Sequence, residues 1–455
     1  MTKLDSEIDH TAKLDSYRFW KMVKSRRKGS RDNLGSGIRF DEKNVRDRQQ
    51  ITDNLGLYFK RLYTPTVSTD YDEQWKVTVT EKVQSVISNI KPDQRVVVLP
   101  ETINKAIAAC PRGKAAGMDC IQYEHLITAK DFLSSVLANL FTHILRLGHI
   151  PDKLKTGCII TLHKGGNKRT DDPNNYRAIS LTSVILKLFE TTLVERSKQA
   201  IMTNLSPQQG GFQENLGVVM TSFVLRESIY FSREHHSKLY VCLLDCKQAF
   251  DRVWFQGIFY KLIECNVDPA SLIAFTELYR NVNSYVKYKG LTSENFPIQQ
   301  GTRQGSKSSP LLYLLYINGL IKELEASKLG MCMYGLNMCS PTVADDMVLV
   351  SFSKSSLYQM VSICHSYAMK WRFEYNINKC AVVIAHGYNS VGERLFSRGR
   401  QQIKQVDKYV HLGITCDQYL STGLLVQEAC RKLRGTFLAI CNSGVHPRNI
   451  NPLTS

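Results

Sequence analysis

The stretch Leu239-Tyr-Val-Cys-Leu-Leu-Asp245 is a nearly unbroken run of apolar residues that ends in an acid. Such a run predicts a strand that is buried on both faces. A second segment has a related pattern: the pair Asp345-Asp346 stands between the short apolar stretch TVA and the run MVLVSF, which predicts strand, turn, strand. An ionised carboxylate beside a buried strand is costly unless it is paired or binds a metal ion. The placement of these acids is therefore the most informative feature of the chain.

Two interpretations of the acids remain open at this point. Asp favours turns because its side chain bonds to nearby backbone, so Asp345-Asp346 alone is compatible with a simple hairpin turn. If neighbouring strands bring Asp245 to this pair, the carboxylates could hold two Mg²⁺ ions about 3.5–4 Å apart, as phosphoryl transfer requires. Mg²⁺ commonly takes one or two carboxylates and completes its shell with substrate phosphates. We interpret Asp251 as lying on a helix surface or supporting the site from behind.

Around these strands, periodicity predicts both helices and further strands. Residues 131–148 predict a helix with Phe132, Val136, Leu140, Ile144 and Leu147 on one face, stopped by Gly148. A strand is expected over 158–164, mostly helix over 179–201, and an amphipathic helix over 424–440. Because helices and strands do not alternate as regular βαβ units, the sequence predicts an α+β fold.

Composition narrows the class of protein. The 455 residues are 43% hydrophobic and 22% charged, which excludes a fully disordered or collagen-like chain and suggests two to four structural units. The formal net charge of +18 favours a polyanionic partner, nucleic acid or an acidic membrane surface, although a merely basic protein has the same composition. No apolar stretch approaches the roughly 18 residues that span a bilayer, so we expect no membrane segment.

The cysteines and the start of the chain indicate a compartment. Thirteen cysteines occur without any C-x-x-C pair, and MTKLDSEIDH is not a signal peptide. These features predict a reducing, intracellular location. The basic run over residues 21–31 suggests either a nucleic-acid-binding arm or a solvated leader, and its KSRRKGSR is a weak nuclear localisation signal.

Several ordered blocks resemble a known family. LLDCKQAFDRVW (243–254), QGTRQGSKSSPLLYLLYINGL (300–320) and TVADDMVLVS (342–351) are similar to the palm of reverse transcriptases, above all those of non-LTR (LINE-type) retrotransposons. Blocks at 113–126, 162–190 and 208–217 upstream, and 371–383 and 409–414 downstream, extend the resemblance over about residues 100–417.

The resemblance implies a fold and a division of the chain. It implies a right-hand polymerase fold with fingers, an antiparallel-sheet palm and a partial thumb. Residues 1–95 would be a basic N-terminal extension resembling the pre-polymerase linker, and 96–417 the fingers and palm, with a core of about 143–417. Residues 418–455 would be a truncated thumb start. The implied activity is RNA-directed DNA polymerisation, in which a primer 3′-hydroxyl is extended with dNTPs on an RNA template by two-metal phosphoryl transfer.

It also implies roles residue by residue. The resemblance assigns the two metal ions, Mg²⁺ with Mn²⁺ as a possible substitute, to Asp245, Asp345 and Asp346. Phe250 matches the aromatic gate beneath the sugar, and Gln304-Gly305 the segment that lines the sugar and base of the incoming nucleotide. The remaining matches are to groups that bind the triphosphate, protonate the leaving pyrophosphate and hold the primer. They are Arg177 and Lys164 for the triphosphate, Lys379 for the protonation, and His411-Leu412-Gly413 for the primer.

The family also implies partners. They are an RNA template, a DNA primer and dNTPs, with no membrane. The endonuclease that often precedes this domain would be supplied elsewhere. Nuclear action is expected from the family.

Some residues depart from the family pattern, and other functions stay open. Val343 replaces the usual aromatic before Ala-Asp-Asp, and Ser306-Lys307 replaces the common Cys-Pro. The alternatives are a catalytically silent nucleic-acid-binding relic or domesticated scaffold, a viral RNA polymerase, and a generic Mg²⁺ nuclease. Phe250 argues against the RNA polymerase, which commonly has a small or acidic group there, and the nuclease would not need Phe250 or Gln304-Gly305.

Overall fold

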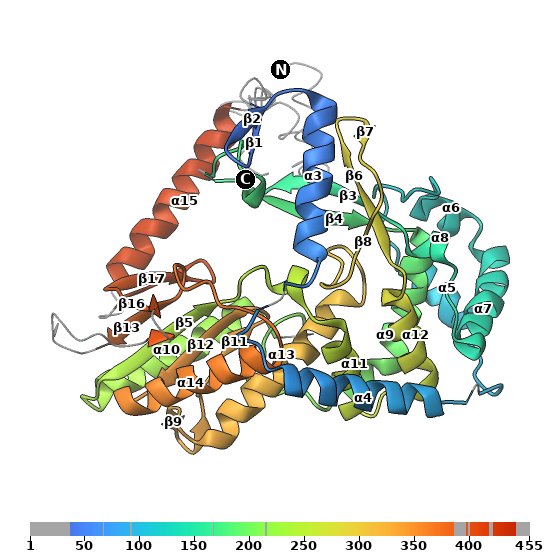
Figure 1. Cartoon of the computed structure of the whole chain (residues 1–455). Helices are drawn as coiled ribbons and strands as arrows, with labels where there is room; N and C mark the ends of the chain where they lie inside the picture. The colour runs from blue at the N-terminus through green and yellow to red at the C-terminus, as the bar shows by residue number, and fades with distance from the viewer. Residues whose placement is uncertain are drawn as a thin grey trace, which may run out of the picture. The chain divides into compact units, whose positions relative to one another are not determined.

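The computed structural model describes residues 37–66, 68–91, 93–166, 168–213, 216–385, 397–398, 401–417 and 422–442. The chain divides into two compact units, one formed by residues 47–420 and the other by residues 1–46 together with 421–455. In the second unit the described elements are the hairpin β1 (Ile38–Phe40) and β2 (Lys43–Val45) and the helix α15 (Thr422–Asn442) (Figure 1). The helix expected over 424–440 is confirmed, and the basic run at 21–31 lies outside the described residues.

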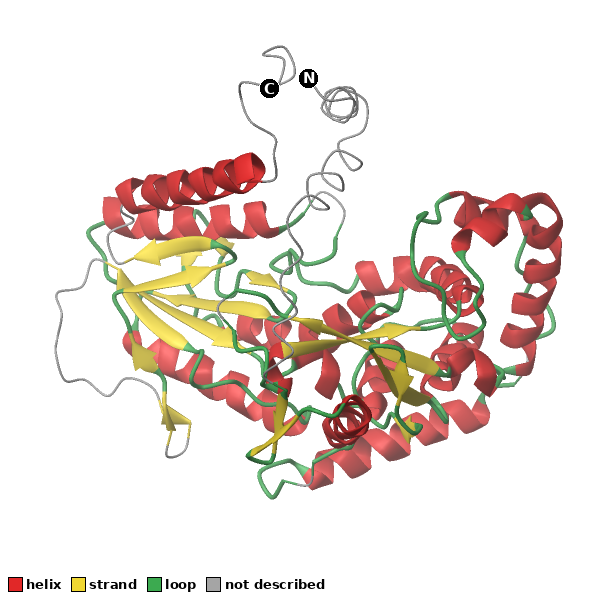
Figure 2. Cartoon of the chain, turned by 90° about the horizontal axis from the view of Figure 1, so that it is seen from above, coloured by secondary structure: helices red, strands yellow, loops and turns green. Residues whose placement is uncertain are grey.

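The larger unit contains two five-stranded sheets. The first has the order β4-β3-β6-β7, with β8 also paired to β6. The second has the order β11-β12-β5-β13-β16. Figure 2, in which strands are yellow and helices red, shows both groups of strands flanked by helices. The strands are β3 (Gly157–His163), β4 (Tyr176–Leu181), β5 (Leu239–Asp245), β6 (Asn283–Tyr288), β7 (Leu291–Thr292), β8 (Phe296–Pro297), β11 (Thr342–Val343), β12 (Asp346–Ser351), β13 (Ala381–Ala385) and β16 (Lys404–Gln405).

Strand β5 is central in the second sheet and buried on both faces, as its sequence predicts. Val241 and Leu243 pack with α10 (Val218–Glu234) on one face, in a cluster that includes Leu225. Cys242 and Leu244 join the main core on the other face, with residues of α13 (Ser309–Ser327) and α14 (Lys354–Lys370). The apolar run is thus explained by helices on both sides of an antiparallel sheet.

The other helices of this unit surround the first sheet and the core. Helix α3 (Arg48–Tyr63) starts at Asp47, whose carboxylate accepts from the Gln50 backbone N–H. Both α3 and α4 (Glu73–Asn89) belong to the unit of residues 47–420, although they fall within the segment 1–95. The remaining helices are α5 (Pro100–Ala108), α6 (Tyr123–Thr128), α7 (Lys130–Leu147), α8 (Asp152–Lys155), η2 (Pro173–Asn175), α9 (Val184–Met202), η3 (Ala249–Arg252), α11 (Phe255–Glu264) and α12 (Pro269–Tyr279).

Short strand pairs complete the unit. They are β9 (Cys332–Met333) with β10 (Leu336–Asn337), β14 (Ser397–Arg398) with β15 (Gln401–Gln402), and β17 (Lys408–His411) with β18 (Ile414–Asp417). The mixture of helices and mainly antiparallel strands confirms the α+β class. Within the described part of the chain, no helix is both long and apolar enough to cross a membrane.

Helix α7 is confirmed, but most of the apolar face identified in its sequence is exposed. It ends at Gly148 in the left-handed conformation, as expected. Phe132 and Leu147 are 75% and 72% exposed, and Val136 and Leu140 are also exposed. The buried side of this helix instead carries Ser134, Leu137, Ala138, Phe141, Thr142, Ile144 and Leu145.

Candidate active site

The acids identified in the sequence meet where β5 and β12 pair. The antiparallel register places Asp245 directly opposite Asp346. Asp345 lies in the tight turn between β11 and β12, after Ala344, whose φ of +56° gives the left-handed residue that such short hairpin loops favour. The turn and the carboxylate cluster are therefore the same feature, because the hairpin delivers Asp345 and Asp346 to the end of β5.

Gln209 is buried and fixes this hairpin from outside the strands. Its Oε1 accepts from the backbone N–H of Ala344 (2.9 Å) and of Gly211 (2.9 Å). A Cβ at Gly211 would lie 2.7 Å from the Ala344 nitrogen, so the segment before α10 lies against the turn without room for a side chain. Gln209 had no assigned role in the sequence, because nothing local distinguishes it from a surface Gln.

Burial and neighbouring negative charges raise the pKa of Asp345 and of Asp346. The pKa of Asp346 is raised to about 6, first by desolvation and then by the charges of Asp345 and Asp245. The pKa of Asp345 is raised for the same reasons, desolvation first and Asp245 next, and Lys379 and Arg177 partly oppose the rise. Placing these acids together thus costs free energy that a bound cation would relieve.

Lys379 is the cation nearest to Asp245. Its Nζ lies 3.2 Å from Oδ2 and 3.4 Å from Oδ1 of Asp245. The turn that carries it is tied to the same strand, since the Asn376 N–H donates to the Asp245 carbonyl (2.7 Å) and the Lys379 N–H donates to the Asn376 carbonyl (2.8 Å). The ammonium group is held beside the strand end by its own backbone.

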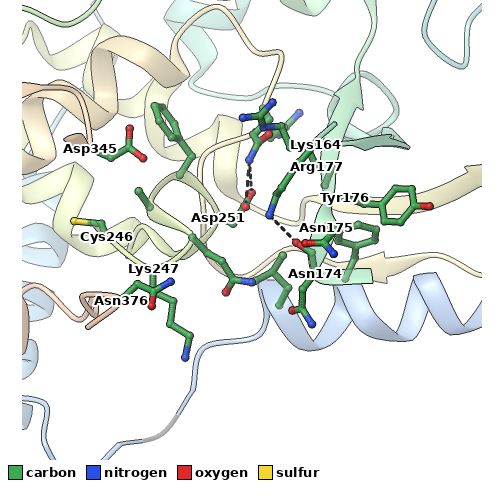
Figure 3. Close-up of a pocket in the computed structure, with 18 of the residues that line it drawn as sticks. Lys164, Asn174, Asn175, Tyr176, Arg177, Cys246, Lys247, Asp251, Asp345 and Asn376 are labelled. Atoms are coloured by element: carbon green, nitrogen blue, oxygen red, sulfur yellow. Dashed lines mark hydrogen bonds between the residues drawn. The ribbon is translucent and has the colours of Figure 1, made fainter. Parts of the chain in front are cut away.

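A cavity of about 740 Å³ opens beside these acids. Its size falls within the usual range of ligand pockets. Figure 3 shows Asp345 on one side, Asp251 near the centre, and Lys164 and Arg177 beyond it. The cavity brings together the predicted metal, nucleotide and proton-donor residues other than Asp346: Asp245, Asp345, Lys379, Lys164, Arg177, Phe250, Gln304 and Gly305. The His411-Leu412-Gly413 turn is not part of its lining.

Two of the cations that line the cavity, Arg177 and Lys164, lie on or directly after strands of the first sheet. Arg177 is exposed on β4, and Lys164 follows β3, whose Leu162 pairs with Arg177 in the register. The Lys164 Nζ donates to the Asn174 carbonyl (2.7 Å), which is visible in Figure 3. Burial first, and then the charges of Lys168 and Lys379, lower the pKa of Lys164. Two cations from adjacent strands therefore face the cavity at one end.

Phe250 lies in η3, stacked on a buried tyrosine. Its ring is 4.4 Å from the ring of Tyr313 at an interplanar angle of 25°, and the edge of Phe212 approaches at 6.2 Å. The Phe250 carbonyl accepts from the Thr302 N–H (2.7 Å). The structure thus places this aromatic ring in the cavity wall and also packs it against the core.

Gln304 and Gly305 also line the cavity. The Gln304 carbonyl accepts from the Ser180 N–H of β4 (2.8 Å). Gly305 has φ of +110°, and a Cβ there would lie 2.9 Å from the Ser180 carbonyl oxygen. Both the backbone conformation and the close approach of β4 therefore require glycine.

Asp251 does not lie on the surface of a long helix, which was the first of the two interpretations given above. It is partly buried and lines the cavity, because η3 is a short 3-10 turn rather than the start of a long helix. Tyr58, Phe59 and Leu62 of α3 line the same cavity. Their contribution could not be inferred from the sequence, since α3 is distant in the chain from every acid of the site.

The His411-Leu412-Gly413 turn joins β17 to β18. His411 is 5% exposed, and burial lowers its pKa to about 4, so its ring is neutral near pH 7. Leu412 and Gly413 have φ of +51° and +79°, which form the tight turn. The buried His therefore supports the hairpin as a neutral side chain.

The donor chemistry fits a divalent cation. Three carboxylates, on two paired strand ends and a turn, provide the oxygen ligands that Mg²⁺ prefers, and a cation would relieve the raised pKa values of Asp345 and Asp346. Among the described residues, no three His, Cys, Asp or Glu side chains already converge closely enough to hold a metal ion. The carboxylates alone would thus supply part of a coordination shell, with room for substrate oxygens.

Comparisons with known proteins agree with this site. Residues 163–416 match the family described as Reverse transcriptase (RNA-dependent DNA polymerase). The chain is 27% identical over 360 residues to the RNA-directed DNA polymerase from mobile element jockey of Drosophila melanogaster, covering 77% of this chain and 38% of that protein. It is 23% identical over 296 residues to a Pol polyprotein from the type-2 retrotransposable element R2DM of the same fly, covering 63% and 27%.

Among solved structures, the chain is similar to a telomerase from Candida tropicalis truncated from its C-terminal domain, with a TM-score of 0.42 and 13% identity over 62% of this chain and 59% of that one. We base the assignment on the sequence match. This chain spans well under half the length of the curated relatives above. The family match covers more than half of the chain and includes every predicted site residue. The chain therefore belongs to the reverse transcriptase (RNA-dependent DNA polymerase) family.

Proposed function

We propose that this chain is an RNA-directed DNA polymerase that extends a primer 3′-hydroxyl with dNTPs on an RNA template, as part of a retrotransposon. One observation carries the proposal: Asp245 faces Asp346 across paired strands, beside a cavity that holds Asp345 at one end and cations at the other. Such a cavity suits a substrate with an anionic triphosphate and a reacting phosphorus near the acids. The family membership of residues 163–416 supports the same reading.

In this proposal the larger unit contains the fingers and palm of a right-hand polymerase. The second sheet, with β5 and β12, corresponds to the palm, and the first sheet, with β3 and β4, to the fingers. Helix α15 corresponds to the start of a thumb.

The side chains of the cavity then have distinct roles. The guanidinium of Arg177 binds phosphate oxygens in a bidentate manner, and Lys164 adds a point charge beside it. The ring of Phe250 lies under the sugar, and Gln304-Gly305 contact the sugar and base. The Lys379 ammonium, near Asp245, donates a proton to the departing pyrophosphate.

Asp245, Asp345 and Asp346 would hold two Mg²⁺ ions, for which Mn²⁺ can substitute. When bound, such ions stabilise the charge that develops on the attacking and leaving oxygens. The chain's own contribution is to fix the carboxylates through the β5–β12 register and the turn held by Gln209. Divalent-metal dependence is general in the family, so chelation with EDTA should stop incorporation.

The partners of the full protein remain proposals as well. They are the RNA template, the DNA primer and dNTPs, with an endonuclease supplied elsewhere and action in the nucleus. The positive net charge of the chain is consistent with binding the template–primer duplex through its phosphates.

The test is primer extension on an RNA template with labelled dNTPs. Asp245→Asn should reduce incorporation about a hundredfold or more, since it removes one of the charges that hold the ions. It should still bind template–primer. The exposed Asp131 on α7 offers a matched control, and Asp131→Asn should extend normally.

The same assay separates the alternatives. Template binding without incorporation would indicate a silent relic or scaffold. Preferred use of rNTPs would indicate an RNA polymerase, and shortening of the template strand would indicate a nuclease. Near-normal extension by Asp245→Asn would refute the catalytic assignment.

A further inference from the structure

Asp251 connects three parts of the cavity wall and has no role in the mechanism above. Its Oδ1 accepts from the hydroxyl of Tyr63 at the end of α3 (3.2 Å). The Gln304 Nε2 donates to both carboxylate oxygens, at 3.0 Å and 3.1 Å. In Figure 3, Asp251 lies near the centre of the view. Residues from α3, η3 and the loop before α13 therefore meet at one carboxylate.

The main-chain segments around Asp251 are closely packed and hydrogen-bonded to each other. The Phe250 carbonyl accepts from both the N–H and the Oγ1 of Thr302, at 2.7 Å and 3.2 Å. The Gly301 N–H donates to the Val253 carbonyl (2.8 Å), and a Cβ at Gly301 would lie 2.4 Å from the Asp251 carbonyl oxygen. The position of Asp251 relative to Gln304 is thus set by the main chain on both sides.

The hydrogen-bonding capacity of the Asp251 carboxylate determines which end of the Gln304 amide faces it. An ionised carboxylate only accepts hydrogen bonds, so the amide must present its NH₂ group to it. The amide oxygen of Gln304 is left as an acceptor for a ligand in the cavity that this residue lines. The sugar 3′-hydroxyl of an incoming dNTP is a donor that this oxygen could accept.

We infer that Asp251 is a positioning residue, which orients the Gln304 amide so that its oxygen accepts from the 3′-hydroxyl of the nucleotide, and that Tyr63 holds Asp251 in place. The inference rests on the proposed polymerase function and extends it to sugar recognition. It also gives α3 a part in the nucleotide site.

The test is a double-mutant cycle on dNTP incorporation. Asp251→Ala should raise KM for dNTP about tenfold, as expected for loss of a hydrogen bond to a charged group, with kcat changed less than about twofold. In the Gln304→Ala background the same substitution should have no further effect. Both single variants should discriminate less between dNTPs and 2′,3′-dideoxynucleotides, a ratio that a general packing defect would leave unchanged.

Milder variants keep the test valid if Asp251→Ala does not fold. Asp251→Asn retains one acceptor oxygen and should restore part of the dNTP affinity. Tyr63→Phe removes one hydroxyl and should have a smaller effect in the same direction, again absent in the Gln304→Ala background.

Additive effects, or an unchanged dideoxynucleotide ratio in variants that still incorporate dNTPs, would overturn the inference alone. Failure of the unaltered chain to incorporate any dNTP would overturn the proposed function and this inference with it.

Discussion

Asp345 and Asp346 are adjacent in the sequence, yet the hairpin gives them different surroundings. Asp345 lies in the turn and lines the cavity, whereas Asp346 is the first residue of β12 and is exposed. Both carboxylates remain within electrostatic reach of Asp245. The two interpretations of the Asp-Asp pair, turn and ion site, are therefore compatible, because a tight turn is what carries the acids to the end of β5.

Phe250 allows a prediction about sugar choice. If its ring lies under C2′ of the nucleotide, it leaves no room for a 2′-hydroxyl. Phe250→Ala should therefore raise the kcat/KM ratio of rNTP to dNTP by about tenfold or more, within the range that pocket shape can supply. Steady-state incorporation of single nucleotides on an RNA template measures this ratio.

The control for this prediction is Phe212→Ala. That substitution removes the aromatic edge contact to Phe250 but leaves its ring stacked on Tyr313. The rNTP/dNTP ratio of this variant should stay near that of the unaltered chain. An unchanged ratio in a folded Phe250→Ala variant would mean that the ring is only a packing residue.

Asp251 also predicts a pH dependence of stability. Desolvation raises its pKa from 3.8 to about 6, against the hydrogen bonds from Tyr63 and Gln304. The folded chain thus holds this proton more tightly than the unfolded chain, so stability falls as pH rises from about 4 to about 6.

Asp251→Asn does not ionise and should escape this loss. Between pH 4 and pH 7 the unfolding free energy of the unaltered chain should fall by up to about 3 kcal/mol relative to the variant, and by less to the extent that solvent reaches the carboxylate. Urea unfolding of both proteins across this range measures the difference. Parallel pH profiles would contradict the prediction.

Among the elements, α9 has a supporting role through Glu190. This side chain is 2% exposed, and its two oxygens accept from the Ser306 hydroxyl (2.6 Å) and from the Lys307 N–H (2.9 Å). Ser306 and Lys307, which stand where the family commonly has Cys-Pro, therefore both donate to a buried carboxylate. Helix α9 holds the loop that carries Gln304 and Gly305.

Glu190→Gln should destabilise the chain by about 1–3 kcal/mol, because it replaces two hydrogen bonds to a buried negative charge by neutral ones and the Ser306 hydroxyl must turn to accept from the amide NH₂. Urea unfolding at neutral pH measures the loss. Ser306→Ala, which removes one donor together with its bond, should cost less. Equal stability of Glu190→Gln and the unaltered chain would show that the loop is held by other contacts.

Helix α7 shows why an apolar stripe does not identify the core. Phe132, Val136, Leu140 and Leu147 share one face, but Leu137, Phe141 and Leu145 form a second apolar face on the other side. The second face is the buried one, and α7 packs against α5 and α12. Periodicity alone could not rank two apolar faces of similar strength.

The net charge of the molecule determines how its affinity for nucleic acid should depend on salt concentration. With a net charge of +18, contacts to template–primer phosphates should dominate affinity. For roughly six or more phosphate contacts, affinity should fall by about three orders of magnitude or more between about 50 and 200 mM salt. Fluorescence anisotropy with a labelled RNA–DNA duplex measures this slope.

Removing a single exposed cation tests how much one phosphate contact adds to the slope of log affinity against log salt concentration. Arg434→Gln on α15 should reduce the magnitude of the log–log slope by about one if the helix contacts a phosphate. Affinity that is flat across the titration would argue against a groove that binds the nucleic-acid backbone.

Local sequence patterns were enough to predict the strands that carry the acids and the α+β class. In Leu239–Asp245 the side chains on both faces of the strand are apolar up to the closing Asp245. The run therefore predicts a strand that is buried on both faces. Turn chemistry and short-range periodicity act within a few residues, so β3, the β11–β12 hairpin and α15 could also be predicted locally. The family resemblance supplied the roles of the site residues, which no local rule provides.

The distant residues that complete the site could be identified only in the folded chain. Gln209, Glu190 and Tyr63 are ordinary polar residues in sequence, and each becomes informative only through a partner more than 100 positions away. The same holds for the buried face of α7 and for the position of Asp251 in the cavity wall. Burial and hydrogen-bond satisfaction depend on which segments pack together, and that is a property of the folded chain rather than of any single segment.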